Sequence, residues 1–287
     1  AKARFSKADS IFVVGDVHGR FDELAQLLQN ARVVDQDLRW RGGKKHLIML
    51  GDLFDRGHDV TRLLWFLYRL EHEARRQKGY VHLVLGNHEI MTMANDLRYL
   101  SGKENLIAAN YGTTYDRLFD VKVSLLGKWL GSKPAIIKID KVLFAHGGVA
   151  PNYAHYAIDA YNDSVFTFLR EPVFHDLVAD SAVVARYDSV YYENRLRFFF
   201  GSLSPFWFRG YVQTDTLGAF LDGVLDRYDA NLHVVAHTPV PTITALYDGK
   251  LIAVDLHNAA TEMLLLVKDG RKYKRFKYDL AGRVGEL

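Results

Sequence analysis

Short apolar runs alternate with longer amphipathic stretches along the first third of the chain. The runs at residues 10–14, 46–50 and 80–85 are mostly apolar and predict buried strands. The stretches between them place leucine and other apolar residues at helical spacing and predict helices. Each run is followed by a glycine, and these glycines recur 36 and 35 residues apart, about the length of a βαβ unit. The alternation therefore predicts an α/β fold with parallel strands and right-handed crossovers.

The second half of the chain contains further strand candidates. Two short runs at 135–139 and 141–145 meet at Asp140. Asp-Gly pairs at 248–249 and 269–270 mark hairpin turns between later runs. The later runs that predict strands are 233–236, 242–247, 251–255 and 263–268.

No linker rich in Pro, Gly or Ser divides the chain. We therefore expect a single domain over residues 1–287, with an aromatic-rich insertion at about 153–215 that is irregular in structure. The stretch from Tyr191 to Tyr211 holds nine aromatic residues, and buried packing is the default interpretation of such a stretch. A substrate wall for a phosphotyrosyl ring and a dimer surface are the alternatives.

Composition limits the classes of function. The chain has 287 residues, of which 49% are hydrophobic and 25% charged, with only 6 prolines, so it is neither disordered nor collagen-like. The formal net charge of +3 is small, and no nucleic-acid partner is expected. No apolar run approaches the roughly 18 residues of a membrane span. The oligomeric state stays open.

The chain contains no cysteine. Disulfides, thiolate ligands and cysteine nucleophiles are excluded, so any metal must be held by His, Asp, Glu or Asn. The absence of thiols fits an oxidising, periplasmic or secreted location slightly better than the cytosol. The sequence begins at Ala1 and its first methionine is Met49, so we expect that an initiator has been removed, by design or with an export signal. The compartment stays open.

Polar side chains follow the predicted strands at the points where the apolar runs stop. GDVHG occupies residues 15–19, GDLFDRG residues 51–57 and GNHE residues 86–89. Two later runs are followed by His146 and His237 in the same manner. Because the carboxyl ends of strands in an open α/β sheet line one crevice, we expect the five clusters to converge there.

The converging side chains offer oxygen and imidazole ligands and no sulfur. This mixture suits Mn²⁺, Fe or Zn²⁺, and the number of ligands suits two ions. A carboxylate such as Asp52 can bridge two metals about 3.5–4 Å apart. A single Asp or His can instead cap a helix or satisfy a turn, but that alternative does not account for five clusters at successive strand ends. The candidate metal ligands are Asp16, His18, Asp52, Asn87, His146 and His237.

The series GDVHG, GDLFDRG and GNHE, followed by HGG and AHT, resembles the calcineurin-like metallophosphoesterases, specifically the phosphoprotein phosphatase family. The motifs span residues 15–238. The resemblance implies a β-sandwich with flanking helices that hydrolyses phosphomonoesters through in-line attack of a metal-bridging hydroxide. It also implies two ligand sets that share one carboxylate: Asp16, His18 and Asp52 for one ion, and Asp52, Asn87, His146 and His237 for the other.

Several details of these motifs resemble those of the bacterial-type branch of the family, and most closely those of the Shewanella-like protein phosphatases. Val84 and Leu85 stand where eukaryotic relatives usually have Leu-Arg, and Phe54 replaces a small aliphatic residue. Residues 206–211, FWFRGY, resemble the aromatic-arginine segment of that group. Members of the branch include enzymes that prefer phosphotyrosine, so the resemblance leaves both phosphotyrosine and phosphoserine or phosphothreonine as substrates.

Four further residues are candidates for catalysis and for phosphate binding. His88 directly follows the ligand Asn87 and is predicted to be the general acid that protonates the leaving group. Asp55 is predicted to hold the imidazole of His88 in the right tautomer, or alternatively to pair with Arg56. Arg56 and Arg209 are predicted to bind the phosphate oxygens. The alternative for Arg209 is surface packing over an aromatic patch.

The remaining histidines and a basic stretch carry weaker predictions. His58 and His257 lie near the motifs and could support the ligands. The basic stretch at 268–277 predicts a lysine-rich edge strand that resists aggregation, with polyanion binding as the alternative. Histidines without matching partners are expected to be ordinary surface or strand residues: His46, His72, His82, His155, His175 and His233.

Taken together, the sequence predicts a dinuclear-metal-dependent phosphatase with Mn, Fe or Zn as its ions. The expected substrate is a phosphorylated protein or a small phosphoester. Dinucleoside polyphosphate hydrolysis and a non-catalytic scaffold of the same fold are the alternatives. A scaffold is expected to have lost ligands or the acid histidine, whereas all of them are present in this chain.

Overall fold

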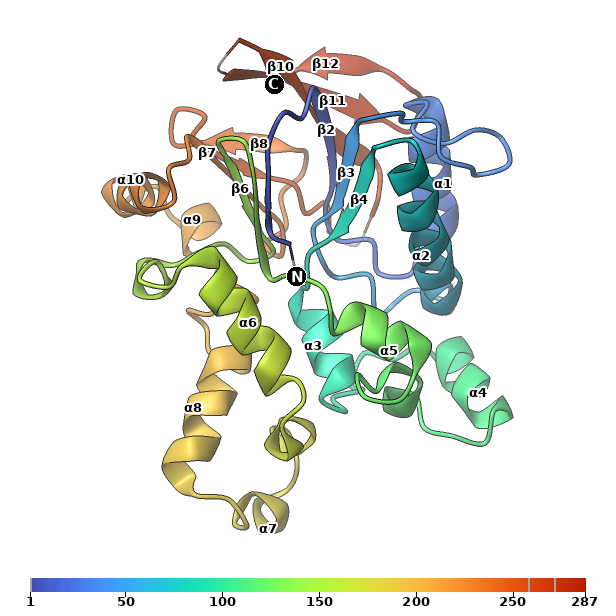
Figure 1. Ribbon diagram of the computed structural model, residues 1–287, viewed down its shortest axis with the longest axis vertical. Helices are drawn as coiled ribbons and strands as arrows, with labels where there is room; N and C mark the ends of the chain where they lie inside the picture. Colours follow the sequence, from blue (N-terminus) through green and yellow to red (C-terminus); the bar gives the residue numbers. More distant parts are fainter. Residues whose placement is uncertain (1, 258, 271) are drawn as a thin grey trace.

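Two six-stranded mixed sheets pack against each other with helices on their outer faces (Figure 1). The computed structural model describes residues 2–257, 259–270 and 272–287. One sheet has the strand order β1-β5-β6-β7-β9-β8 and the other β12-β11-β10-β2-β3-β4. This confirms the predicted α/β class, with a sandwich of sheets flanked by helices.

The first sheet consists of β1 (Arg4–Phe5), β5 (Ile136–Ile139), β6 (Val142–Ala145), β7 (Leu232–Val235), β8 (Thr244–Leu246) and β9 (Leu251–Ala253). The second consists of β2 (Ser10–Val14), β3 (His46–Met49), β4 (Tyr80–Leu83), β10 (Glu262–Asp269), β11 (Lys272–Asp279) and β12 (Val284–Glu286). The α-helices are α1 (Phe21–Asn30), α2 (Val60–Arg76), α3 (Asn87–Met93), α4 (Gly102–Asn110), α5 (Leu125–Leu130), α6 (Ile158–Phe168), α7 (Ser181–Val184), α8 (Ser189–Phe200), α9 (Gly210–Gln213) and α10 (Gly218–Arg227). Three 3₁₀ helices are η1 (Asp116–Phe119), η2 (Pro151–Tyr153) and η3 (Pro172–Asp176).

Strand β2 shows how the apolar runs build the core. Ile11 and Val13 point into the layer between the two sheets, and Phe12 and Val14 point toward the helices on the other face. All four side chains are buried, which explains why the run is continuously apolar rather than alternating. Strands β2, β3 and β4 are parallel in register, so their carboxyl ends lie at one edge.

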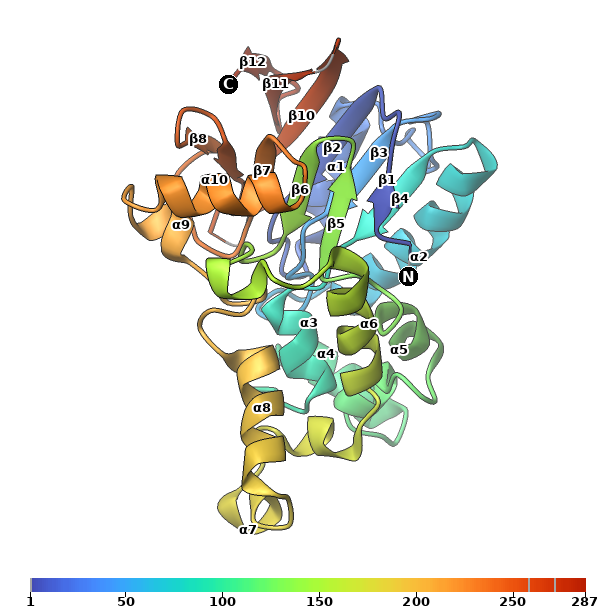
Figure 2. The same ribbon diagram turned by 60° about the vertical axis from the view of Figure 1, so that its left-hand side comes forward.

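The segment that the sequence suggested to be irregular, residues 153–215, is largely helical. Helices α6, α7 and α8 project from one end of the sandwich (Figure 2). Asp188 caps α8, because its carboxylate accepts a hydrogen bond from the main-chain N–H of Tyr191. The three consecutive phenylalanines 198–200 spread aromatic rings around α8 and obscure its helical periodicity, which explains the wrong prediction.

The basic stretch at 268–277 forms most of β11, which is not simply an edge strand. It pairs with β10 along its length and with β12 at residues 276–278, so only its first half is left at the margin. The edge prediction was therefore wrong for the second half, because the short sequence of β12 gives no strand signal. Residue 271 lies outside the described residues.

None of the helices in the described ranges is both long and apolar enough to cross a membrane.

Candidate metal centre

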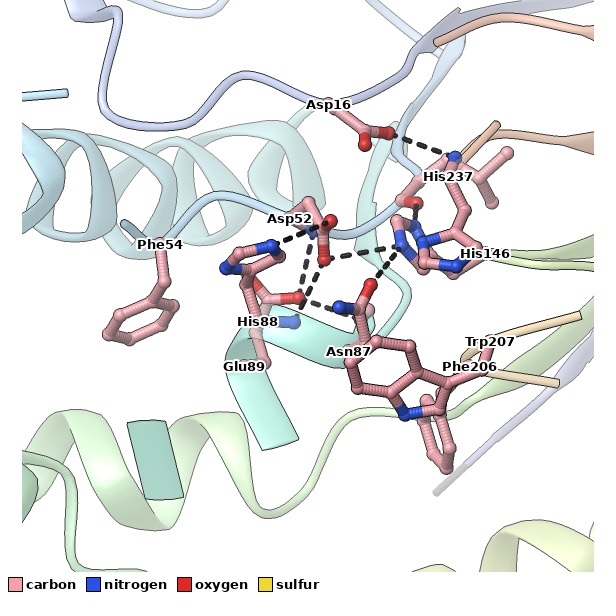
Figure 3. Close-up of polar contacts among 12 residues, drawn as sticks. Asp16, Asp52, Phe54, Asn87, His88, Glu89, His146, Phe206, Trp207 and His237 are labelled. Carbon is pink, nitrogen blue, oxygen red and sulfur yellow. Dashed lines mark hydrogen bonds and ion pairs between the residues drawn. The ribbon is translucent and has the colours of Figure 1, made fainter. Parts of the chain in front are cut away.

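The predicted ligands come from five loops at one end of the sandwich. They follow β2, β3, β4, β6 and β7, at the carboxyl end of each strand. Figure 3 shows that the side chains of five of them point toward one another: Asp16, Asp52, Asn87, His146 and His237. All six are at most 4% exposed, although each is polar or charged: Asp16, His18, Asp52, Asn87, His146 and His237.

The first group of donor atoms surrounds one oxygen of Asp52. Oδ2 of Asp52 lies 3.8 Å from Nε2 of His18 and 3.8 Å from Nε2 of His88. These three residues place ligand atoms within 4.8 Å of one another. Asp16, which the sequence placed in this group, has Oδ2 3.9 Å from Nε2 of His18. Its Oδ1 accepts a hydrogen bond from the main-chain N–H of His237 at 3.2 Å.

The second group lies on the other side of the same carboxylate. Oδ1 of Asp52 lies 3.2 Å from Nε2 of His146, and Oδ1 of Asn87 lies 3.0 Å from the same nitrogen. His237 completes this group, because Asp52, His146 and His237 place ligand atoms within 4.8 Å of one another. Asp52 therefore belongs to both groups, which is the position that a bridging carboxylate requires.

Two imidazole nitrogens in these groups fit a cation. Nδ1 of His18 hydrogen bonds to the carbonyl oxygen of Phe54 at 2.7 Å, so the N–H lies there and the lone pair is left on Nε2. Among the described residues, Nε2 of His18 and Nε2 of His237 are buried without a hydrogen-bond partner. Buried polar atoms are rarely left unpaired. Two lone pairs and a carboxylate facing the same space are a donor set suited to divalent cations.

Burial and charge set the protonation of these groups. Burial lowers the pKa of His18 to about 4 and, together with the charge on His146, lowers that of His237 to about 2. Both rings are therefore neutral at pH 7, which is the form that binds metals. Burial opposes ionisation of Asp52, but His146, His88 and His18 outweigh it and hold its pKa well below the usual range. Asp52 is ionised.

The loops adopt a strained backbone at these positions. Five non-glycine residues have positive φ: 45° at His18, 51° at Asp52, 68° at Asp55, 64° at Arg56 and 65° at His237. Such conformations cost roughly 1–3 kcal/mol each and persist where the surrounding structure fixes them. Their concentration in the predicted site indicates loops that are held in place for their side chains.

Two glycines are required by close backbone contact. A Cβ on Gly51, whose φ is 89°, would lie 2.7 Å from Cα of Gly86. A Cβ on Gly86 would lie 2.3 Å from Oδ1 of Asp52. The recurring glycines of the sequence therefore let two loops approach each other around the shared carboxylate.

His88 and Asp55 form a buried pair beside the donor groups. Nδ1 of His88 lies 2.6 Å from Oδ2 of Asp55, as the sequence predicted for an oriented imidazole. Burial lowers the pKa of His88, but the charges of Asp52 and Asp55 outweigh it and the pKa lies above its ordinary value. The pair can therefore present a proton on Nε2 toward the space between the donor groups.

Two arginines lie at the site, one in the loop that carries Asp52 and the other far along the chain. Nη2 of Arg56 lies 3.4 Å from Nε2 of His88. Nη1 of Arg209 donates a hydrogen bond to the carbonyl oxygen of His237 at 2.5 Å. Both guanidinium groups thus lie next to predicted ligand or acid residues.

Sequence reasoning assigned no role at the site to two buried acids. Glu89 is fully buried, and its carboxylate accepts hydrogen bonds from the main-chain N–H of Asp52, Leu53 and Gly86 at 2.9, 2.7 and 2.7 Å. It therefore fastens the loop of Asp52 to the start of α3. Asp255 follows β9 and, after burial, contributes most to raising the pKa of Asp16. The pattern that identified the predicted ligands, a polar residue after a strand, would also have identified Asp255 after β9.

The aromatic segment contributes mainly to packing. Phe206 is fully buried against Phe199, and the hydroxyl of the buried Tyr211 donates to the carbonyl oxygen of Val149 at 2.9 Å. These contacts agree with the default interpretation of this stretch. Trp207 is half-buried, and its ring lies edge-on to His237 at 5.7 Å.

The match to a family covers most of the chain. The family described as Calcineurin-like phosphoesterase matches residues 10–241. The chain belongs to this family of metal-dependent phosphoester hydrolases.

Three proteins that are similar to this chain are named as protein phosphatases. A crystal structure of a cold-active protein-tyrosine phosphatase from a psychrophilic Shewanella species is 31% identical, with a TM-score of 0.87, over 100% of this chain and 82% of that one. Shewanella-like protein phosphatase 1 of Plasmodium berghei is 26% identical over 93% of this chain and 70% of its own length. Shewanella-like protein phosphatase 2 of Arabidopsis thaliana is 35% identical over 102 residues, which are 36% of this chain and only 26% of that protein.

Proposed function

We propose that this chain is a protein phosphatase that uses two divalent cations and acts on phosphotyrosyl side chains. The observation that carries the proposal is Asp52, a buried carboxylate shared by two groups of imidazole and oxygen donors, with His88 beside it. The chain aligns over its whole length with a protein named a tyrosine phosphatase, which supports the choice of substrate.

The donor groups suggest how two cations would be held. Asp16, His18 and Asp52 would bind one, and Asp52 with Asn87, His146 and His237 would bind the other. When bound, two such cations supply the Lewis acidity that polarises a phosphoryl oxygen and lowers the pKa of water. Manganese, iron and zinc all suit oxygen and imidazole donors.

The chain's own residues bind the phosphate and move the proton. Arg56 and Arg209 would each offer a planar fork to the non-bridging oxygens, where negative charge spreads in the transition state. His88 would donate the proton on Nε2 to the ester oxygen as that oxygen leaves. Asp55, at 2.6 Å from Nδ1, fixes the ring and favours its protonated form.

Two aromatic side chains favour an aryl ester. The ring of Tyr99, which is 47% exposed, lies 5.4 Å from the ring of His88. Trp207 stands beside His237. An exposed aromatic ring next to the acid that protonates the leaving group suits the phenyl ring of phosphotyrosine.

The test is phosphate release from three substrates by protein reconstituted with Mn²⁺. The panel holds a phosphotyrosyl peptide, a phosphoseryl peptide of the same sequence, and diadenosine tetraphosphate with a coupled phosphatase. We expect release from the phosphotyrosyl peptide to be fastest and to stop with a chelator. An Asp52→Asn protein purified in the same way controls for contaminating phosphatases.

Each other result changes the proposal in a defined way. Faster release from the phosphoseryl peptide would retain the protein phosphatase and overturn the tyrosyl preference. Turnover of the dinucleotide alone would assign the chain to nucleotide hydrolysis, which is less supported because two relatives that match more than nine-tenths of the chain are named protein phosphatases. No turnover with two ions bound would favour a scaffold.

A further inference from the structure

An apolar groove lies outside the metal centre, between α2, α4, η1 and α5. Its volume is about 650 Å³, and its walls include Trp65, Ile107, Tyr111, Leu118 and Leu125. This is within the range of roughly 300–1,000 Å³ that is typical of binding cavities. Helix α4 lies at the margin of the molecule on this side (Figure 1).

Large apolar side chains around the groove are exposed to solvent. Tyr111 is 78% exposed, Val123 74%, Leu106 64%, Leu125 53% and Trp65 47%. These five account for a large part of the exposed large apolar residues in the described ranges, and they come from four neighbouring segments. Trp65, Tyr111 and Leu125 also line the groove, and a large exposed apolar patch on a monomer marks a site of interaction.

The groove is preformed rather than loosely packed. The carboxylate of the buried Glu104 in α4 accepts hydrogen bonds from the N–H and the hydroxyl of Thr61 in α2, at 3.1 and 2.5 Å. The hydroxyl of Tyr115 donates to the same carboxylate at 3.3 Å. These bonds join the two helices and the loop before η1, so an occupant need not order the walls when it binds.

The floor of the groove adjoins the loop that carries Asp52. Phe119, which lines the groove, packs edge-on against Phe54 with ring centroids 4.8 Å apart. The carbonyl oxygen of Phe54 in turn accepts the hydrogen bond from His18. The side chains of Phe119 and Phe54 thus connect the groove to the backbone that orients a predicted ligand.

The charges around the groove indicate the chemistry of the occupant. In the segment 101–131, the acidic residues are buried or half-buried, whereas the charged residues that are fully exposed are all basic. Two copies of the chain facing each other here would bring like charges together, which disfavours a symmetric dimer. The exposed basic residues are Lys103, which pairs with Asp59 at 2.6 Å, and Arg117, Lys122 and Lys128.

We propose that this groove docks an apolar segment of a partner protein whose flanking side chains are acidic. The apolar side chains of the segment would fill the groove between α4 and α5, and its Asp and Glu residues would face the basic rim. Complementary charge steers such an encounter, and burial of the apolar surface stabilises the complex. The proposal does not depend on the phosphatase activity.

The test is selection of peptides from a display library on the folded, metal-reconstituted chain. Peptides of roughly 12 residues are long enough to place a helical turn or two in a groove. The selection is run in parallel on the variant Tyr111→Glu/Leu125→Glu, whose changes lie at exposed positions and leave the core intact. Selected peptides are then synthesised and their affinities measured by fluorescence anisotropy.

We expect the selected peptides to carry apolar residues flanked by Asp or Glu. Their affinity should fall about tenfold or more in Tyr111→Glu/Leu125→Glu, and in Lys122→Glu/Lys128→Glu the acidic flanks should lose their advantage. Phe220→Glu, an exposed apolar position on α10, is the matched control and should bind normally. Hydrolysis of p-nitrophenyl phosphate should be unchanged in all variants.

Three results would overturn the proposal. The first is a failure to enrich any peptide that the groove variant loses. The second is enrichment of peptides with basic or neutral flanks. The third is a concentration-dependent dimer, seen by light scattering, that the groove variant abolishes, because the occupant would then be a second copy of the chain.

Discussion

The loops at the ends of the strands and the helical segment 158–213 are fixed by different forces. In the loops, polar side chains such as His18 and Asp52 are buried, the backbone is strained, and Nε2 of His18 faces the carboxylate of Asp52 without a hydrogen bond. In the helical segment, rings such as Phe198 and Phe199 are buried among other rings. The loops are therefore fixed by contacts among buried polar side chains, and the helical segment is fixed by the packing of apolar rings.

This difference separates activity from stability. Strained loops with buried charges are tolerated where they hold a reacting group, and they do not add to stability. Aromatic packing contributes free energy of unfolding through the apolar area it removes from water. Changes in the loops should therefore lower activity first, and changes in the helical segment should lower stability first.

The largest effect is expected from Asp52→Asn. The substitution removes the charge that both donor groups share, so cation affinity and phosphatase activity should each fall by more than about a hundredfold. Metal content after gel filtration and phosphate release from the phosphotyrosyl peptide measure the two losses. Full metal retention would contradict the bridging role of Asp52.

His88→Ala should have a large effect that depends on the leaving group. Alkyl phosphates need a proton on the departing oxygen, so their hydrolysis should slow by about 10²–10⁴-fold. Aryl phosphates leave more easily and should slow far less. Steady-state kinetics on both classes, with metal content as the control, test this. Equal losses would remove His88 from the acid role, and loss of metal would make it a ligand.

Phe199→Ala should lower stability and leave activity unchanged, which is the reverse of the effect expected for substitutions in the loops. Phe199 is fully buried against Phe174, Phe198 and Phe206, so its truncation should lower the free energy of unfolding by about 3–5 kcal/mol. Chemical denaturation measures this loss. The kcat per folded molecule should not change, and a large fall in kcat without loss of stability would link the helical segment to the chemistry.

Glu89→Gln tests whether a buried acid that is not a predicted ligand supports activity by holding the loop of Asp52 in place. A glutamine offers one acceptor oxygen to the three main-chain N–H groups that Glu89 now binds, so the loop of Asp52 should loosen. We expect activity to fall roughly 10–100-fold. Glu104→Gln, another buried acid but outside the metal centre, is the control. It should lower stability and leave activity unchanged, and equal losses of activity would remove the special role of Glu89.

The smallest expected effect is on the pH dependence of stability, and it comes from residues outside both regions. His46 and His82 are buried on neighbouring strands, with Nδ1 of His46 3.0 Å from Nε2 of His82. Burial lowers the pKa of His46 from 6.5 to about 4, and lowers that of His82 as well. The unfolded chain therefore binds more protons between pH 6.5 and about 4, so stability should fall as the pH drops through this range.

His46→Gln should flatten that part of the pH dependence. Midpoints of urea unfolding at several pH values between 7.5 and 4.5 measure it. His72→Gln, at an exposed position, should retain the slope of the parent chain. Parallel curves for all three proteins would show that the buried pair does not contribute.

The sequence predicted the parts of the fold that depend on neighbouring residues. The apolar runs gave β2, β3 and β4 and the glycines that follow them, because strand and turn signals lie within a few residues. The pairing of β10 beside β2 joins strands about 250 residues apart, and nothing local in the sequence specifies it. The sequence did not predict helix α8, because its phenylalanines contact residues far along the chain and do not follow a helical period.

The candidate site was predictable for a related reason. Residues such as Asp16 and His146 stand in short motifs whose spacing is dictated by one turn of backbone. Asp255 and the groove beside α4 were not predicted, since each depends on which segments meet in space. Roles for the site residues stay predictions that the variants above test.

The most direct test is the number and coupling of manganese ions bound to the chain. Equilibrium dialysis against Mn²⁺ gives the number, and electron paramagnetic resonance shows whether the ions interact through a shared ligand. Because Asp52 lies in both donor groups, we expect two ions per chain with an exchange-coupled signal. One ion per chain, or two ions with independent signals, would contradict a shared two-metal centre.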